Sequence, residues 1–344
     1  MRIAQVATLS FSVPPKLYGG IERVASYLTE ELVAQGHEVT LFASGGSETA
    51  ARLVRVCPHA LNRVETNEER RHHYVRMMQL VFADVSRFDV IHFHTESIPL
   101  SWLRRQPCPN VTTLHYQLGA PCLKPLYDEY NPPLVSISNN QRLPIPDVNW
   151  QATVYHGLPR DLFTFREEPG DYLAFIGRVS FEKRLDRAIR IACEAGMKLR
   201  VAAKINREDE HFKQDIEPLL REAGESVEFV GEIGGREKDD FLGNARALLF
   251  PIDWPEPFGL VMIEALACGT PVIAWREGSV PEVIDDGRTG FIVKSIEEAV
   301  EAVGRVAGLN RHACRQAFEN RFDAGCMARG YLEVYRRLVD AASK

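Results

Sequence analysis

The sequence lacks any apolar run long enough to cross a membrane. A spanning helix needs about 20 consecutive apolar residues, so we expect no transmembrane segment. The N-terminal residues Met1–Ala7 also lack the longer apolar core and cleavage site of a secretory signal peptide. They are typical instead of a first buried strand. These two absences predict a cytoplasmic protein.

Paired cysteines are absent as well. The seven cysteines include no CxxC pair, and their number is odd. Several of them lie in apolar or helical stretches. We therefore expect buried, reduced thiols rather than disulfides or a metal site.

Excess positive charge is also missing, since the formal net charge is −6. A general nucleic-acid binder carries a basic footprint, so no nucleic-acid partner is predicted. We find no strongly basic amphipathic helix that favours a membrane surface. The sequence does have 45% hydrophobic and 26% charged residues, as in globular proteins, and its 344 residues suffice for two domains.

Short apolar runs alternate with amphipathic segments along almost the whole chain. This alternation is typical of parallel sheets covered by helices on both faces. The expected strands are Ile3–Ala7, Val39–Ala43, Val90–Phe93, Val111–Leu114, Leu134–Ile137, Tyr172–Ile176, Leu199–Ala202, Val227–Val230, Ala247–Phe250, Val272–Ala274 and Phe291–Val293. The clearest helical patterns are Ile21–Gln35, Arg184–Ala195, Leu260–Ala267 and Ser295–Val306. The fold class is therefore α/β.

The expected strands divide into two sets around residues 156–170, a stretch rich in helix breakers and charge. We predict two Rossmann-like, doubly wound domains that face a central cleft, residues 1–160 and 161–322. A last helix, in residues 323–344, has no strand after it. Ligands of such sheets bind beyond the carboxyl ends of the strands.

The stretch from Glu256 to Glu264 places two carboxylates eight residues apart, one before a helix and one inside it. Pro257 and Gly259 mark the turn between them. Backbone N–H groups at the helix start form a seat for a phosphate. Glu264 lies among apolar residues, and a buried carboxylate needs partners, which ribose hydroxyls would supply. A solvated Glu256 and a locally paired Glu264 are the plain alternative.

A second motif, Gly177-Arg178 followed by Lys183, comes directly after the first strand of the second half. Two cations at a strand end are suited to clamp a diphosphate and to stabilise charge on a leaving phosphate. Ordinary surface cations are the alternative, but the motif shares its expected sheet edge with Glu256.

The loop after the first strand contains Tyr18-Gly19-Gly20. Paired glycines allow backbone to approach a ligand closely. The loop has neither a GxGxxG pattern nor the GK[ST] ending of a P-loop, so neither NAD nor a P-loop nucleotide is supported.

Polar residues gather at strand ends in the first half, among them Glu96, His115 and Tyr116. His115 closes its strand and is the functional candidate, with a structural histidine as the alternative. We expect His92 and His94 to face opposite sides of their strand, which argues against a metal pair.

These motifs together resemble the retaining glycosyltransferases of family 4, which have the GT-B fold. The resemblance covers nearly the whole chain. It rests on Gly19-Gly20, on His115, on the G-R-x4-K signature of Arg178 and Lys183, and on the E-x7-E motif of Glu256 and Glu264. The segments Gly269–Val272, Ser279–Glu282 and Asp286–Phe291 continue it.

The resemblance implies roles for the second half. Arg178 and Lys183 would grip the diphosphate of a nucleotide-sugar donor, and Glu264 would bind the ribose. Glu256, together with the backbone N–H groups of Phe258, Gly259 and Leu260, would hold the transferred sugar and phosphate. No metal or other cofactor would be required, because protein cations replace Mg²⁺.

For the first half, the resemblance implies that the Gly19-Gly20 loop closes over the diphosphate and that His115 lies near the sugar and the acceptor. Tyr18, Glu96 and Tyr116 would shape the acceptor side. The terminal helix would cross back to the first domain. The chain departs from the family at Arg184, where Gly is frequent.

The implied reaction is retaining transfer of a hexose from a nucleotide-diphosphate sugar to an acceptor hydroxyl. UDP and glucose are the commonest donor parts in the family, while GDP and ADP are not excluded. A glycoside hydrolase, a nucleotide-sugar epimerase and a catalytically silent nucleotide-sugar-binding protein are the alternatives. The acceptor and the oligomeric state are not readable from the sequence.

Overall fold

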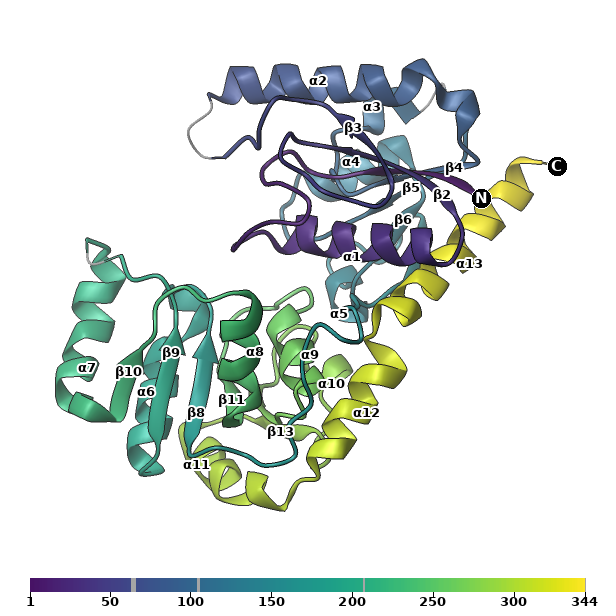
Figure 1. Ribbon diagram of the computed structural model, residues 1–344. Coiled ribbons are helices and arrows are strands. Elements are labelled where there is room, and N and C mark those ends of the chain that lie inside the picture. The colour runs from purple at the N-terminus through teal and green to yellow at the C-terminus, as the bar shows by residue number, and fades with distance from the viewer. Residues whose placement is uncertain (63–65, 104–105, 207, 344) are drawn as a thin grey trace. The chain divides into compact units, whose positions relative to one another are not determined.

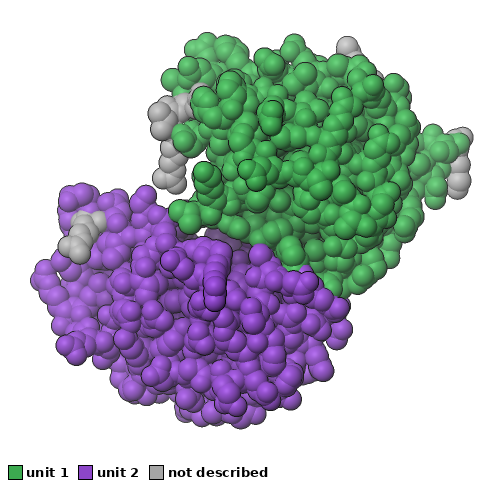
Figure 2. Space-filling model, in the orientation of Figure 1, with its two compact units in different colours: residues 1–159, 323–344 green, residues 160–322 purple. Residues whose placement is uncertain are grey.

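The computed structural model describes residues 1–62, 66–103, 106–206 and 208–343 and separates into two compact units (Figure 1). The first unit comprises Met1–Pro159 with Asp323–Lys344, and the second comprises Arg160–Phe322 (Figure 2). The chain therefore leaves the first unit after Pro159 and returns to it at Asp323.

The first unit is built on a parallel sheet with the strand order β3-β2-β1-β4-β5-β6-β7. The strands are β1 (Arg2–Val6), β2 (Glu38–Ala43), β3 (Arg52–Arg55), β4 (Val90–Phe93), β5 (Asn110–Thr113), β6 (Leu134–Ser136) and β7 (Trp150–Thr153). Its helices are α1 (Gly20–Ala34), α2 (Asn67–Ala83), η1 (Val85–Arg87), α3 (Leu100–Leu103), α4 (Leu123–Tyr130), α5 (Asn139–Arg142) and α13 (Ala324–Ala342).

The second unit has a parallel sheet with the order β10-β9-β8-β11-β12-β13. The strands are β8 (Tyr172–Ile176), β9 (Lys198–Ala202), β10 (Val227–Phe229), β11 (Ala245–Phe250), β12 (Val272–Trp275) and β13 (Gly290–Val293). The helical segments are η2 (Phe181–Lys183), α6 (Leu185–Glu194), η3 (Phe212–Ile216), α7 (Glu217–Ala223), η4 (Gly224–Ser226), α8 (Gly235–Gly243), α9 (Leu260–Ala267), α10 (Val280–Val283), α11 (Ile296–Arg305), η5 (Val306–Gly308) and α12 (Arg311–Arg321).

The predicted α/β class is confirmed by these two parallel sheets. Their central strands are buried on both faces, as β1 and β8 illustrate, which is why they read as continuous apolar runs. Two strands were missed, β3 and β7. Both lie at the edges of the first sheet and are only partly buried, so neither has a clear apolar pattern.

Helix boundaries follow local capping signals. The Ser295 hydroxyl accepts a hydrogen bond from the Glu298 N–H at the start of α11, and the Asp323 carboxylate accepts one from the Cys326 N–H at the start of α13. Such caps satisfy backbone donors that the helix itself leaves unpaired. In the described part of the chain, no helix is long and apolar enough to span a membrane.

The terminal helix α13 belongs to the first unit, where it packs against α1 (Figure 1). Tyr331 and Tyr335 of this helix are fully buried. The Tyr335 hydroxyl lies 2.7 Å from His92 Nδ1 and accepts a hydrogen bond from Gln5 Nε2 at 3.1 Å. The helix is thus fixed to the first sheet by polar contacts as well as by apolar packing.

Candidate active site

Two loops of the second unit bring predicted site residues together. β8 and β11 are parallel neighbours, so the loops that follow them leave the same edge of the sheet. Lys183, in the loop after β8, forms an ion pair with Glu256, in the loop after β11. Their side chains are only 16% and 15% exposed, so water screens the attraction weakly.

Trp254 completes this pair, although the sequence analysis missed it. Its Nε1–H donates to Glu256 Oε2 at 2.9 Å, and the Lys183 ammonium lies 5.1 Å from the centre of its ring. The negative face of an indole ring attracts a cation. One aromatic side chain therefore orients both charged partners.

Arg178 is more exposed than Lys183 and is held less firmly by its partner. Its side chain is 55% exposed and lies 3.1 Å from the carboxylate of Glu182, four residues further along the chain. An exposed pair of this kind is held weakly. Arg178 is therefore free to turn toward an anion at small cost, whereas Lys183 has to leave a shielded partner.

The turn into α9 depends on two glycines. Gly259 has a φ of 77°, and a Cβ there would come within 2.9 Å of Met262 Cε and 3.1 Å of Phe250 Cζ. A Cβ at Gly278 would lie 2.3 Å from the Glu256 carbonyl oxygen. Among the described residues, no side chain caps the start of α9. Its first N–H groups thus have the character of an anion seat.

Glu264 is buried, as its apolar neighbours predict, with 3% of its surface exposed. Its partner is Lys238 of α8, whose Nζ lies 2.5 Å from Glu264 Oε2. The pairing corresponds to the plain alternative for this residue, and Lys238 was not foreseen. The Lys238 side chain remains 21% exposed, so the buried carboxylate is connected to the surface through one ammonium group.

In the first unit, the glycine loop lies over a buried carboxylate. Gly19 has a φ of 136°, and a Cβ there would approach Pro15 Cβ to 2.8 Å. Glu22, in the first turn of α1, accepts hydrogen bonds from Thr8 Oγ1 at 2.5 Å and from the Phe11 N–H at 3.2 Å. Burial raises the pKa of Glu22, while these bonds oppose the rise. Glu22 thus ties the loop after β1 to the start of α1.

The expectation for His92 and His94 was wrong. Their ring centres lie 4.1 Å apart, on the same side of β4. Side chains alternate along a strand, so residues two apart share a face. Within the described ranges, however, no group of three or more His, Cys, Asp or Glu side chains is placed to hold a metal.

His115 joins this histidine cluster. His94 Nδ1 lies 3.0 Å from His115 Nε2, and the ring of His156 stacks on His115 at 5.3 Å. Burial lowers the pKa of His115 well below its ordinary value, with a further contribution from the neighbouring histidines. His115 Nδ1 is buried without a hydrogen-bond partner among the described residues. A neutral imidazole whose other nitrogen is already engaged keeps one nitrogen with unused hydrogen-bonding capacity.

The three residues predicted for the acceptor side all lie in the first unit. Glu96 has a φ of 55° and accepts a hydrogen bond from the His115 N–H at 2.8 Å. Burial raises the pKa of Glu96 to about 7, against the opposing backbone hydrogen bonds. Tyr18 and Tyr116 expose 60% and 59% of their surface. Exposed rings beside a buried polar cluster suit a sugar-like ligand.

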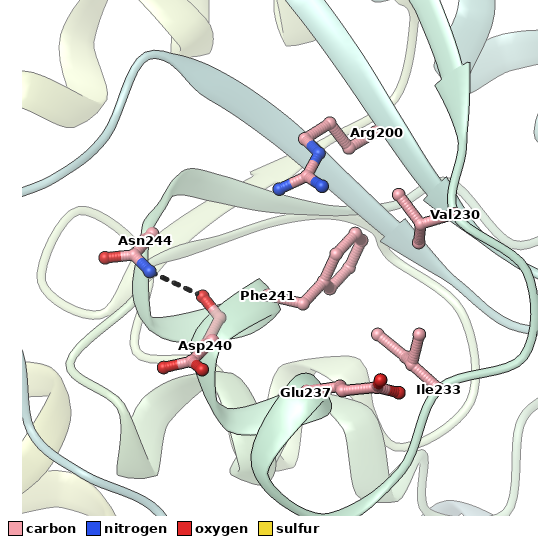
Figure 3. A pocket seen from close by; sticks show the side chains of 7 residues that line it. All are labelled: Arg200, Val230, Ile233, Glu237, Asp240, Phe241 and Asn244. Carbon is pink, nitrogen blue, oxygen red and sulfur yellow. Dashed lines mark hydrogen bonds between the residues drawn. The ribbon is translucent and has the colours of Figure 1, made fainter.

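A groove of about 330 Å³ lies elsewhere in the second unit, between α8 and β9, beside the end of β10 (Figure 3). The Arg200 guanidinium lies 4.9 Å from the centre of the Tyr172 ring and 5.8 Å from that of Phe241. Glu237 and Asp240 add negative charge to the same groove. Asp240 is already paired with Arg166 at 2.6 Å, and none of the predicted donor residues lines this groove, so we do not assign the donor to it.

Comparison with known proteins agrees with the geometry. The family described as Glycosyl transferases group 1 matches residues 163–318, and the one described as Glycosyltransferase Family 4 matches residues 18–141. The second unit thus matches the group 1 glycosyltransferases and the first unit matches family 4, so this protein is a glycosyltransferase. The predicted resemblance and the predicted enzyme class are thereby confirmed.

Relatives of this glycosyltransferase cover its full length. The crystal structure of AviGT4, a glycosyltransferase involved in avilamycin A biosynthesis, is 25% identical, covers 99% of this chain and 98% of its own, and has a TM-score of 0.76. A phosphatidyl-myo-inositol mannosyltransferase from Mycobacterium leprae is 24% identical over 100% of this chain and 99% of its own. The Anabaena protein HepE in complex with UDP-glucose, 17% identical with a TM-score of 0.71, covers 98% of this chain and 100% of its own and shares the fold. The two-domain GT-B prediction is confirmed at the level of fold.

Proposed function

We propose that this glycosyltransferase transfers a hexose, glucose, from UDP-glucose to an acceptor hydroxyl with retention of configuration and without a metal ion. The observation that carries the proposal is the Lys183–Glu256 ion pair beside the uncapped start of α9. The pair places a cation that suits a phosphate directly beside a carboxylate that suits sugar hydroxyls.

The donor diphosphate would replace Glu256 as the partner of Lys183. Arg178, which is exposed and only weakly held, adds a second cation, and the N–H groups of Phe258, Gly259 and Leu260 add donors at the helix start. Negative charge grows on the diphosphate as the sugar departs. One such contact to a developing charge is worth about 3 kcal/mol, so protein groups supply what a metal ion would otherwise supply.

In a retaining transfer, the acceptor approaches the face of the sugar that the nucleotide leaves. The departing diphosphate then receives the acceptor proton, and no protein base is required. Glu256 releases its contact with Lys183 and binds the transferred sugar, while Glu264 binds the ribose. In the first unit, the unused Nδ1 of His115 accepts a hydrogen bond from a sugar hydroxyl, and Tyr18, Glu96 and Tyr116 face the acceptor.

The choice of UDP and glucose is supported by the UDP-glucose complex of HepE, which shares the fold. The mannosyltransferase from M. leprae is the competing precedent. A test must therefore compare nucleotides before it compares sugars.

The first experiment is thermal unfolding in EDTA with saturating UDP, GDP, ADP or CMP. A ligand at 100 times its dissociation constant stabilises the folded state by about 2.7 kcal/mol. We expect a shift with UDP in the wild type and a smaller one in Glu264→Gln, which keeps the shape of the side chain and loses its charge. Lys198→Ala, in an exposed pair of the same unit, is the control and should behave as wild type.

Binding then has to be connected to transfer. We expect slow hydrolysis of UDP-glucose in EDTA, with a product that first appears in the anomeric form of the donor when followed by NMR. An inverted first product would exclude retention, and a requirement for Mg²⁺ would exclude metal independence. Binding of UDP without hydrolysis or transfer would instead identify a silent nucleotide-sugar-binding protein.

A further inference from the structure

The backbone of Arg184 has a conformation that arginine rarely adopts. Its φ is 53° and its ψ is 51°, in the left-handed region. It directly follows Lys183 and stands at the junction of η2 and α6. Strain of this kind persists where surrounding contacts over-determine it and is concentrated at functional sites. The side chain of Arg184 shows what those contacts are.

The Arg184 guanidinium connects the two loops of the site. Its Nε and Nη2 donate to Asp186 at 2.9 and 2.8 Å, within α6. Its Nη1 donates to Asp253 Oδ2 at 2.7 Å. Asp253 precedes Trp254 in the loop that carries Glu256. The planar guanidinium thus spans from one loop to the other, which a glycine at this position has no means of doing.

Further contacts reinforce the same connection. Arg187 Nη2 lies 3.2 Å from Asp253 Oδ2, and the Asp253 N–H donates to the Glu182 carbonyl at 3.0 Å. The Arg184 side chain is only 19% exposed. The Asp253 carboxylate is therefore held by two arginines and its backbone by the loop after β8.

The connection matters because the Lys183–Glu256 pair has to open. When Lys183 turns to a phosphate, its bond to Glu256 no longer holds the two loops in register. The Arg184–Asp253 bridge includes neither residue and persists through that exchange. A small displacement of a positioning group is enough to weaken binding and catalysis strongly.

We propose that Arg184 and Asp253 are positioning residues that hold the Lys183 loop against the Glu256 loop while the diphosphate is bound. The inference rests on the proposed function, since it presumes that Lys183 and Glu256 bind the donor. Neither Arg184 nor Asp253 needs to touch the donor.

The test is isothermal titration of UDP into Asp253→Asn and Arg184→Gly. Glycine adopts a positive φ without strain, so the second variant removes the bridge and keeps the backbone favourable. We expect UDP to bind about tenfold more weakly to both variants, a difference of about 1.4 kcal/mol, while their melting temperatures stay within about 3 °C of wild type.

Asp285→Asn is the matched control. Asp285 pairs with Arg321 at 3.0 Å and is 39% exposed, against 37% for Asp253, and it belongs to neither loop of the site. We expect wild-type affinity for UDP in this variant. The double variant Arg184→Gly with Asp253→Asn should lose clearly less affinity than the sum of the two single losses, because both changes act on the same Arg184–Asp253 bridge.

The outcomes separate the two proposals. Wild-type UDP affinity in both bridge variants, or additive losses in the double variant, would overturn the positioning role and leave the proposed function standing. A fall in melting temperature with unchanged UDP affinity would assign the bridge to stability alone and also overturn it. Absence of binding of UDP, GDP, ADP and CMP to the wild type would overturn the proposed function, and the positioning role with it.

Discussion

The two units differ in the polar clusters that they contain: the first has a buried cluster of histidines, and the second has a cluster of ion pairs. In the first unit, His92, His94, His115 and His156 are buried and burial lowers their pKa values, so they stay neutral and share hydrogen bonds. In the second unit, Lys183, Glu256 and Arg184 form ion pairs in the loops that follow β8 and β11. A buried neutral network loses stability when one of its members is protonated. An ion-pair cluster loses stability when one of its partners is removed. We therefore expect changes in the first cluster to act mainly on the stability of its unit, and we propose that changes in the second act mainly on donor binding.

Acid provides the largest test of this comparison. The pKa of His94 and that of His156 fall to about 3 in the folded unit, against about 6.5 in an unfolded chain. Between these values the unfolded chain binds more protons, so stability is complete above pH 6.5 and is lost as the pH falls toward 3. Each such histidine removes about 1.4 kcal/mol of unfolding free energy per pH unit. We expect the protection of backbone amides against hydrogen exchange, corrected for the intrinsic rate at each pH, to fall at pH 5 more in β4 and β5 than in β8 and β11.

Glu96 opposes this loss and supplies the control. The folded state raises the pKa of Glu96 to about 7 from 4.5, so the folded unit binds a proton that the unfolded chain has released between these values. The raised pKa of Glu96 therefore stabilises the folded unit at low pH, and this stabilisation is lost as the pH rises through 7. Glu96→Gln should therefore make the acid destabilisation steeper. Equal loosening of both units, or an unchanged slope in Glu96→Gln, would contradict the comparison.

Removal of Lys183 is the next largest perturbation. Lys183→Ala leaves Glu256 with its hydrogen bond from Trp254 and takes one cation from the leaving diphosphate. We expect kcat/KM for donor hydrolysis to fall by about 10²–10³-fold, with a much smaller change in the melting temperature. Lys198→Ala is the control. A wild-type rate in Lys183→Ala would remove this residue from the donor site.

A smaller effect is expected when α13 loses one hydroxyl. Tyr335→Phe leaves His92 Nδ1 and Gln5 Nε2 without a partner that they share in the first unit. Buried polar atoms deprived of a partner cost about 1–3 kcal/mol. Denaturant titration measures this loss, and Tyr18→Phe, at an exposed ring, should change little. Equal stability of the two variants would mean that the Tyr335 hydroxyl contributes nothing to the attachment of the helix.

The smallest effect concerns Arg178. Its pair with Glu182 is exposed, so Arg178→Ala should change the unfolding free energy by less than about 1 kcal/mol. Donor turnover should nevertheless decrease, because the cation acts on the leaving diphosphate. A loss of stability that exceeds the loss of turnover, when both are expressed as free energies, would make Arg178 a structural residue.

Much of the fold was predictable because a parallel strand that is buried on both faces appears in the sequence as a continuous apolar run. All eleven expected strands coincide closely with strands of the structure, namely β1, β2, β4, β5, β6, β8, β9, β10, β11, β12 and β13. The edge strands β3 and β7 escaped notice because partial burial leaves no apolar run. Helix limits such as those of α11 were readable from caps, which are local chemistry.

The sequence by itself determined the two parallel sheets, the turns that need glycine and the identity of the charged motifs, since all of these depend on local pattern and spacing. Only the tertiary structure decided which groups meet. Lys238 reaches Glu264, Trp254 orients Lys183, and Arg184 joins Asp253. Four histidines form a row of ring contacts, and His92 at one end of that row contacts α13. Such pairings depend on which strand ends are neighbours and on how deeply each group is buried. No spacing along the chain encodes either quantity.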